Sequence, residues 1–199
     1  ILVENKNNKL SDEESRAVNI AENLLLIERK KRIKPFFDNK VQTDLNSYWL
    51  YTNLFSSLLL QNKDLYDQTI NSIDVLNKKL NNKIFHCYHK ANNEIDVFLE
   101  DYTYYALLLI TLYEIENDQN ALKKCTSIME NAWTLFFNKE NNLMQKNILN
   151  SNDLFTNPID IADNNIQNGN SIYLLVCNKL KNITNQKTWL EKIDILTKS

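Results

Sequence analysis

The scarcity of glycine limits the fold of this chain more than any other feature of its sequence. One glycine and two prolines occur among 199 residues. Hairpin turns and phosphate-binding loops depend on glycine, because glycine adopts positive φ angles without steric strain. The sequence therefore excludes a hairpin-rich β fold, a dinucleotide-binding fingerprint and a phosphate-binding loop. Asparagine is abundant, and we expect it to supply the turns and helix caps.

Composition and charge exclude further classes of protein. Hydrophobic residues make up 43% of the chain and charged residues 24%, which is typical of a soluble globular domain. The 23 basic and 25 acidic residues leave a net charge of −2, so we expect neither nucleic acid nor a membrane as a partner. Cysteines at 87, 125 and 177 form no C-x-x-C pair. We expect buried thiols, a cytoplasmic location, and no cofactor or metal.

Apolar residues recur at helical spacing in seven segments of the chain. The first is expected at 11–31, because Ser11 and Glu14 form a capping box at its start. The other six form three pairs joined by tight turns: 43–60 with 62–80, 99–116 with 119–137, and 168–180 with 186–198. Between helices we expect a loop at 34–42, a short strand at 83–89, a turn at Asn92-Asn93 and an irregular stretch at 138–167.

The three pairs predict a ring of helical hairpins. The first helix of each pair is the more apolar, as in residues 104–110, so we place it inside its partner. Tight and long connections alternate, which brings all the long connections to one face. The pattern predicts an all-α fold, an (α/α) toroid, in which three hairpins make about half of a six-hairpin ring. We expect residues 1–199 to form one domain, a fragment of a larger barrel.

Four short blocks of sequence lie at or just before the predicted inner helices: Arg29 to Lys40, Thr43 to Ser47, Leu99 to Tyr102, and Asp163 to Ser171. In this order they resemble the motifs R-x-x-R-x-R-P-x-x-D-D-K, T-D-W-N-G, L-E-D-Y-A and D-G-A-x-P-S-G-N-S of the YyaL family, relatives of the spermatogenesis-associated thioredoxin-like protein. The resemblance implies a six-hairpin-glycosidase-like barrel, which in that family follows a thioredoxin-like domain that this chain lacks.

The chain departs from these motifs at four positions. Leu45 replaces a Trp, Ser47 a Gly, Gln167 a Pro and Asn39 an Asp. Two interpretations stay open: a diverged site, or a site that no longer catalyses a reaction.

The motif blocks predict a polar site around one mouth of the ring. We expect substrate-binding side chains from Asp38, Lys40, Asp44, Asn46, Glu100, Tyr102 and Asn170. Glycoside hydrolysis needs two carboxyl groups, one protonated and one ionised, and Asp101 and Asp163 are the catalytic candidates. The alternative is that the Asp and Asn residues only cap helices.

Two other kinds of residue near the blocks have simple interpretations. We expect Lys40 to contact a ligand or to pair with Asp38 or Asp44. His86 and His89 would point to opposite faces of a strand, so we expect no shared metal.

Two functions follow from these observations. The first is the binding or processing of a carbohydrate-like small molecule. The second is a non-catalytic scaffold or interaction module that accompanies a thioredoxin-like domain in the parent chain, or that self-associates through the open ring. Carboxyl groups of raised pKa in an open pocket would favour the first function. Carboxyl groups used only as helix caps would favour the second.

Overall fold

The computed structural model describes residues 10–38, 40–81, 83–88, 97–149, 156–163 and 165–198. The chain divides into two compact units, at residues 1–38 and 39–199. The described part of the first unit holds one helix, α1 (Asp12–Lys30), whose residues are all at least partly exposed. Ser11 Oγ accepts the Glu14 N–H, and Glu14 Oε2 accepts the Ser11 N–H at 2.8 Å. The predicted capping box is therefore confirmed. A single domain over 1–199 stays a prediction.

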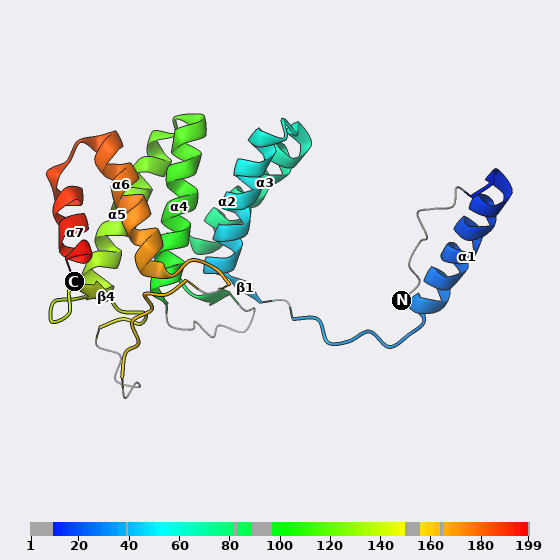
Figure 1. Cartoon of the computed structure of the whole chain (residues 1–199), viewed down its shortest axis with the longest axis horizontal. Coiled ribbons are helices and arrows are strands. Elements are labelled where there is room, and N and C mark those ends of the chain that lie inside the picture. The colour runs from blue at the N-terminus through cyan, green and yellow to red at the C-terminus, as the bar shows by residue number, and fades with distance from the viewer. Residues whose placement is uncertain are drawn as a thin grey trace. The chain divides into compact units, whose positions relative to one another are not determined.

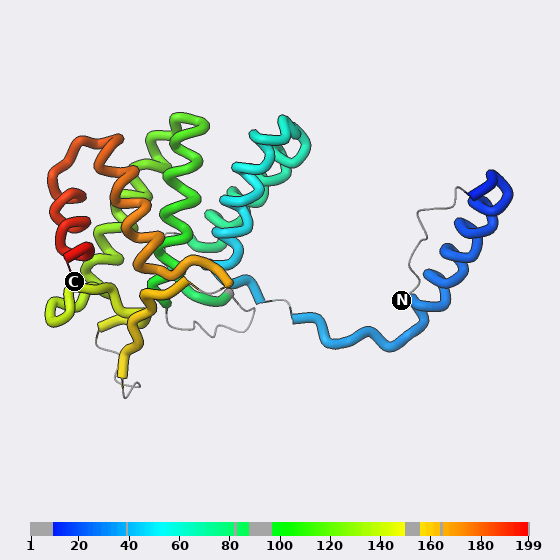
Figure 2. The backbone as a smooth tube through the Cα atoms, in the orientation of Figure 1, coloured from blue at the N-terminus to red at the C-terminus, as the bar shows by residue number. Residues whose placement is uncertain are grey.

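The second unit consists of three helical hairpins, as predicted. They are α2 (Thr43–Leu59) with α3 (Lys63–Leu80), α4 (Leu99–Glu116) with α5 (Gln119–Phe136), and α6 (Gly169–Thr184) with α7 (Lys187–Thr197). The inner helices α2, α4 and α6 run in the same direction, with α4 between the other two (Figure 1). Their N-termini therefore lie at one end of the unit, together with the long connections (Figure 2). None of the described helices is both long and apolar enough to cross a bilayer.

Helix α4 forms the centre of the core. Every residue from Thr103 to Thr111 is buried. A helix that is apolar on all sides must be covered on all sides, and α2, α5 and α6 provide that cover. The prediction that the first helix of a pair is the inner one is confirmed here. Cys87, Cys125 and Cys177 are free and buried, again as predicted.

Asparagine takes the positive φ angles that other chains give to glycine. Asn117 and Asn185 end the first helices of two hairpins at a φ of 55° each, and Gln61 has a φ of 50° in the third turn. Gly169, in contrast, does not have a positive φ. A Cβ atom on Gly169 would lie 2.8 Å from the Leu99 side chain. The one glycine is needed for space, because the first turns of α4 and α6 approach each other closely.

Two short antiparallel ribbons lie among the connections. Strand β1 (Val41–Gln42) pairs with β2 (Cys87–Tyr88), and β3 (Phe137–Asn138) pairs with β4 (Leu143–Met144). The predicted strand at 83–89 was too long, since residues 83–86 are irregular. His89 and the predicted Asn92-Asn93 turn lie outside the described residues. β1 occupies the end of the predicted 34–42 loop, and its pairing with β2 joins the start of α2 to the segment that precedes α4.

Candidate functional site

A cavity of about 340 Å³ lies where the N-terminal ends of the inner helices meet, and we name it the mouth cavity. Helix α2 contributes Asp44 and helix α4 contributes Glu100. The remaining lining residues come from the connections: His86, Phe98, Lys146, Asp160, Ala162, Ile166, Gln167 and Asn168. The cavity is therefore built by segments that are far apart in the sequence.

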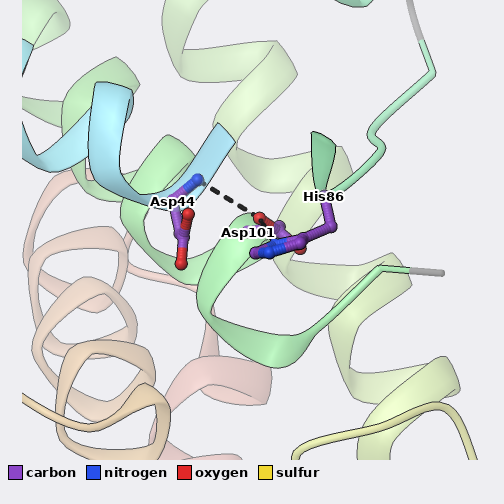
Figure 3. A group of neighbouring side chains, drawn as sticks. All are labelled: Asp44, His86 and Asp101. Carbon is purple, nitrogen blue, oxygen red and sulfur yellow. Dashed lines mark hydrogen bonds and ion pairs between the residues drawn. The ribbon is translucent and has the colours of Figure 1, made fainter. Parts of the chain in front are cut away.

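Asp101 lies behind the wall of this cavity and joins three segments. Its carboxylate accepts the Phe98 N–H at 2.8 Å and the Asp44 N–H at 3.2 Å. His86 Nδ1 lies 3.1 and 3.2 Å from its two oxygens (Figure 3). The Asp101 side chain is fully buried. Asp101 thus fixes the start of α4, the start of α2 and the His86 ring relative to one another.

The His86–Asp101 pair has pKa shifts with different causes. Burial raises the pKa of Asp101 above its usual range, although the hydrogen bonds from His86 and Phe98 oppose this shift. The hydrogen bond to Asp101 raises the pKa of His86. Gln42 Nε2 lies 3.2 Å from His86 Nε2. With the proton on Nδ1, both ring nitrogens of a neutral His86 have partners.

The same group contains the best candidate ligands for a metal in the described part of the chain. Three donor atoms, one each from Asp44, His86 and Asp101, lie within 4.8 Å of one another. Two carboxylates and an imidazole suit a divalent cation. Binding of a cation would require His86 Nδ1 and the Asp101 carboxylate to give up their mutual hydrogen bond. The donor set therefore fits an internal hydrogen-bonded pair better than a metal site.

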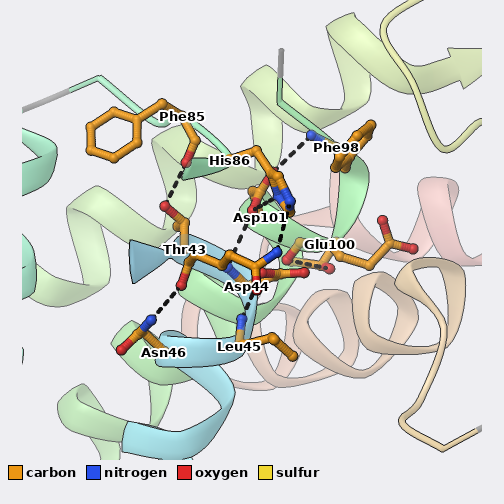
Figure 4. Close-up of polar contacts among 11 residues, drawn as sticks. Thr43, Asp44, Leu45, Asn46, Phe85, His86, Phe98, Glu100 and Asp101 are labelled. Carbon is orange, nitrogen blue, oxygen red and sulfur yellow. Dashed lines mark hydrogen bonds and ion pairs between the residues drawn. The ribbon is translucent and has the colours of Figure 1, made fainter. Parts of the chain in front are cut away.

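Glu100 is the unusual carboxyl group of the mouth cavity (Figure 4). Burial raises its pKa, and the hydrogen bond from its own backbone N–H and the positive charge of Lys146 only partly offset this effect. Its Oε2 atom is buried and has no hydrogen-bond partner among the described residues. Lys146 Nζ instead donates to Asp160 Oδ2 at 3.0 Å, in an ion pair that also lines the cavity. A buried carboxyl oxygen without a hydrogen-bond partner is rare, which makes Glu100 a candidate site residue.

Two other predicted residues have structural roles at the start of α6. Asp163 Oδ1 accepts the Asn168 N–H at 2.9 Å and the Asn168 side-chain amide at 2.7 Å. Asn168 in turn caps α6, because its Oδ1 accepts the Ser171 N–H at 3.0 Å. Asn170 is buried and contacts the backbone N–H and C=O of Met144. Asp163 therefore supports a helix cap, and Asn170 attaches α6 to β4.

The remaining predicted site residues are not among the residues that line the mouth cavity. Tyr102 contacts Phe136 edge to face, with ring centroids 5.5 Å apart, and lines a different cavity. Asn46 Nδ2 donates to the Gln42 carbonyl at 2.7 Å. Asp38 and Lys40 are exposed and belong to different units. Asp44 and Glu100 are thus the two predicted residues that line the cavity.

Three lining residues with titratable side chains were not predicted as site residues: His86, Lys146 and Asp160. His86 reaches the site because β1 pairs with β2, a contact for which the sequence gives no local signal. Lys146 and Asp160 lie in the irregular stretch at 138–167, where no periodicity indicates which side chains face inward. A charged residue in a long connection near predicted helix starts is the one signal that could have drawn attention to them.

Comparison with known proteins supports the fold and leaves the family open. No family model and no curated protein matches the chain. The motif resemblance to the YyaL family therefore stays a prediction. Among solved structures, the chain is similar to the alpha-1,6-mannanase GH76A of Salegentibacter sp. HEL1_6, with a TM-score of 0.56 and 17% identity over 92% of this chain and 53% of that chain.

Two inactive variants of the same mannanase are also similar to the chain. The variant in complex with alpha-1,6-mannotriose has a TM-score of 0.57 and 15% identity, covering 78% of this chain and 46% of that chain. The variant in complex with alpha-1,6-mannotetrose has a TM-score of 0.55 and 17% identity, covering 92% and 52%. The chain thus spans about half the length of these neighbours. Its three hairpins form part of a ring with the (α/α)-toroid fold of these glycosidases.

Proposed function

We propose that the mouth cavity binds a carbohydrate and that Glu100 acts there as a protonated acid. The observation that carries this proposal is that Glu100 lines the cavity while its buried Oε2 atom has no hydrogen-bond partner among the described residues. A small rotation of this side chain toward the cavity would let the oxygen contact a ligand group at that position. A sugar hydroxyl or a glycosidic oxygen could occupy this position.

The charges around Glu100 suit carbohydrate chemistry. Because burial raises its pKa, Glu100 keeps its proton to a higher pH than a solvent-exposed glutamate and can donate it to a leaving oxygen. Asp44 is the second carboxyl group at this wall, and we assign to it the role of the ionised partner that glycoside hydrolysis requires. The Lys146–Asp160 ion pair offers a further donor and acceptor for neighbouring hydroxyls.

Asp101 and Asp163, which the sequence indicates as the catalytic pair, have other roles in this proposal. All the contacts of the Asp101 carboxylate described above are internal, and its side chain is fully buried. Asp163 is engaged in supporting the cap of α6. We therefore assign both as positioning residues: Asp101 places Asp44 and His86, and Asp163 places Asn168.

The structural neighbours support the choice of ligand class. Their complexes contain alpha-1,6-linked mannose oligosaccharides, and the inactive variants carry replacements at two consecutive aspartates. Glu100 and Asp101 are likewise two consecutive acidic residues, at the start of an inner helix. Because the chain spans about half the length of these neighbours, hydrolysis by the whole protein is part of the proposal, whereas binding can be tested on the chain itself.

The test is a titration of the 199-residue chain with alpha-1,6-mannotriose and with a panel of gluco-, galacto- and xylo-trisaccharides, followed by calorimetry and by NMR shifts. We expect saturable binding of at least one sugar. Glu100→Gln should weaken that binding at least tenfold, which corresponds to about 1.4 kcal/mol. Glu140→Gln is the matched control, because Glu140 is exposed in the turn between β3 and β4.

Two outcomes would contradict the proposal. One is sugar binding that Glu100→Gln leaves unchanged, which would place the ligand elsewhere. The other is a folded chain that binds no sugar in the panel. The second result would favour a non-catalytic module that accompanies a thioredoxin-like domain or a second copy, a function compatible with the capping roles of Asp101 and Asp163.

A further inference from the structure

A second cavity, of about 520 Å³, lies on the outer side of α4, and we name it the outer cavity. Its walls come from the end of α3 and the segment after it, from α4 and from α5. None of its lining residues lines the mouth cavity. Its volume falls in the range of small-molecule sites, roughly 300 to 1,000 Å³. Nothing in the proposed carbohydrate site requires this second cavity.

One wall of the outer cavity is aromatic and aliphatic. Tyr102 and Tyr105 come from α4, and Phe85 comes from the segment before β2. The hydroxyl of Tyr105 donates to Asn77 Oδ1, which holds the ring in place. Ile128 and Leu135 of α5 add aliphatic surface. Such walls bind the flat apolar body of a ligand by dispersion and ring stacking.

Helix α5 also contributes a row of polar groups to the cavity. Lys124, Ser127 and Asn131 are spaced three and four residues apart, so they lie on the same side of the helix. All three line the cavity. The Lys124 ammonium, the Ser127 hydroxyl and the Asn131 amide can each donate a hydrogen bond. A ligand with an acceptor group could take hydrogen bonds from this row of donors.

Lys124 is a partly buried cation that lines the outer cavity, and none of the described lining residues is acidic. Lys124 Nζ lies 5.0 Å from the centre of the Tyr105 ring, and no hydrogen bond or ion pair to a carboxylate is described for it. Burial lowers the pKa of Lys124. An anion beside this ammonium would gain charge-assisted hydrogen bonds and would relieve the effect of burial.

We propose that the outer cavity binds a small aromatic carboxylate, with its ring against the partly exposed Tyr102 and its carboxylate against Lys124 and Ser127. A carboxylate fits better than a phosphate, because the described walls provide one partly buried ammonium and two neutral donors rather than a cluster of cations or a helix N-terminus. The proposal is independent of the carbohydrate site, since the two cavities share no lining residue.

The test compares two probes of the same shape and different charge, 2-naphthoate and 2-naphthylmethanol, in titrations of the 199-residue chain followed by ligand-observed NMR. We expect 2-naphthoate to bind about tenfold more tightly. Lys124→Met should abolish that preference, because it keeps an unbranched side chain and removes the charge. Lys123→Met is the matched control, since Lys123 is the exposed neighbour on the same helix. Ser127→Trp should prevent binding of both probes by filling the cavity.

Three results would overturn the proposal: equal binding of the two probes, a preference for the carboxylate that survives Lys124→Met, or undiminished binding to Ser127→Trp. Circular dichroism of each variant shows whether it is folded. If Ser127→Trp does not fold, Ser127→Gln serves as a smaller obstruction. Glu100→Gln should leave 2-naphthoate binding unchanged, so failure of the carbohydrate proposal and failure of this one are distinguishable.

Discussion

The starts of α1 and α4 contain the same hydrogen bond in opposite surroundings. At each, a carboxylate in the third helical residue accepts the N–H of the residue before the helix, at 2.8 Å: Glu14 from Ser11, and Asp101 from Phe98. At the exposed end of α1 this hydrogen bond lowers the pKa of Glu14. At α4 burial prevails and the pKa of Asp101 is raised. Local sequence builds the helix start, and tertiary burial decides the direction in which the pKa of the carboxyl group shifts.

The largest effect is expected from Asp101→Ala. The substitution leaves the Phe98 N–H, the Asp44 N–H and His86 Nδ1 without their acceptor at a buried position. Loss of one partner of a buried network typically lowers the free energy of unfolding by about 3 to 5 kcal/mol. Chemical denaturation measures this change. Asp194→Ala, at an exposed position of α7, is the control and should change stability by less than about 0.5 kcal/mol. A similar small loss for Asp101→Ala would show that the buried contacts contribute little.

The second largest effect that we expect is a decrease in the free energy of unfolding as the pH rises through the titration of His86. Because the folded-state pKa of His86 is raised above 6.5, its stabilisation is fully present below pH 6.5 and is lost as the pH passes the folded pKa. Unfolding is measured between pH 5.5 and 9 in a His89→Gln background, in which His86 is the remaining histidine. His86→Asn keeps a donor near Nδ1 and should flatten the curve. An unchanged slope in that variant would assign the titration to another group.

The third effect is expected at the exposed helix start. Ser11→Ala removes the hydroxyl that accepts the Glu14 N–H. Loss of such a cap typically destabilises a helix by about 1 kcal/mol. Because α1 has no buried residue, we expect NMR secondary shifts of α1 to move toward coil while global unfolding is unchanged. A shift of the global unfolding curve would contradict this separation. Ser11→Asp, which restores an acceptor, should restore the shifts.

The smallest effect is the acid response of Glu14, and its sign is opposite to that of Asp101. The stabilisation from Glu14, whose folded pKa is lowered, is present above pH 4.5 and is lost as the pH falls through the folded pKa. For Asp101, whose folded pKa is raised, stability decreases as the pH rises through the folded pKa. Acidification should therefore move the α1 secondary shifts toward coil before those of α4. If the secondary shifts of α1 and α4 moved at the same pH, the difference in burial would not separate the acid responses of the two helices.

Helix positions were predictable because they depend on local patterns. The periodicity of apolar residues predicts the three hairpins, and asparagine ends α4 at Asn117 as expected. The predicted end of α6 at residue 180 was too early, because the helix continues to Thr184 and ends at Asn185. Asp44 and Glu100 were predicted at the site because they follow helix starts. The face of each helix could also have been derived. Residues two apart on a helix point about 200° apart, so Glu100 and Tyr102 do not share a cavity.

The rest of the site depends on tertiary contacts that local patterns do not encode. His86 enters it through the pairing of β1 with β2, which are more than 40 residues apart. Lys146 enters through the backbone hydrogen bond from Leu99 N–H to its carbonyl. The burial of Asp101 follows from the convergence of these segments. The same carboxylate that the sequence indicates as catalytic is therefore enclosed by the contacts that build the cavity.

Gly169 has no side chain, and this allows the first turns of α4 and α6 to lie close together at the mouth cavity. A single added methyl group there would overlap the Leu99 side chain and approach Glu100 Oε1 to 3.2 Å. The first turns of α4 and α6 would then have to move apart. A larger side chain at position 169 would therefore increase the distance between Glu100 and Asn168, which line the cavity on α4 and before α6. No residue that lines the cavity would be replaced. The width of the mouth cavity between these two walls would be adjustable at this one position.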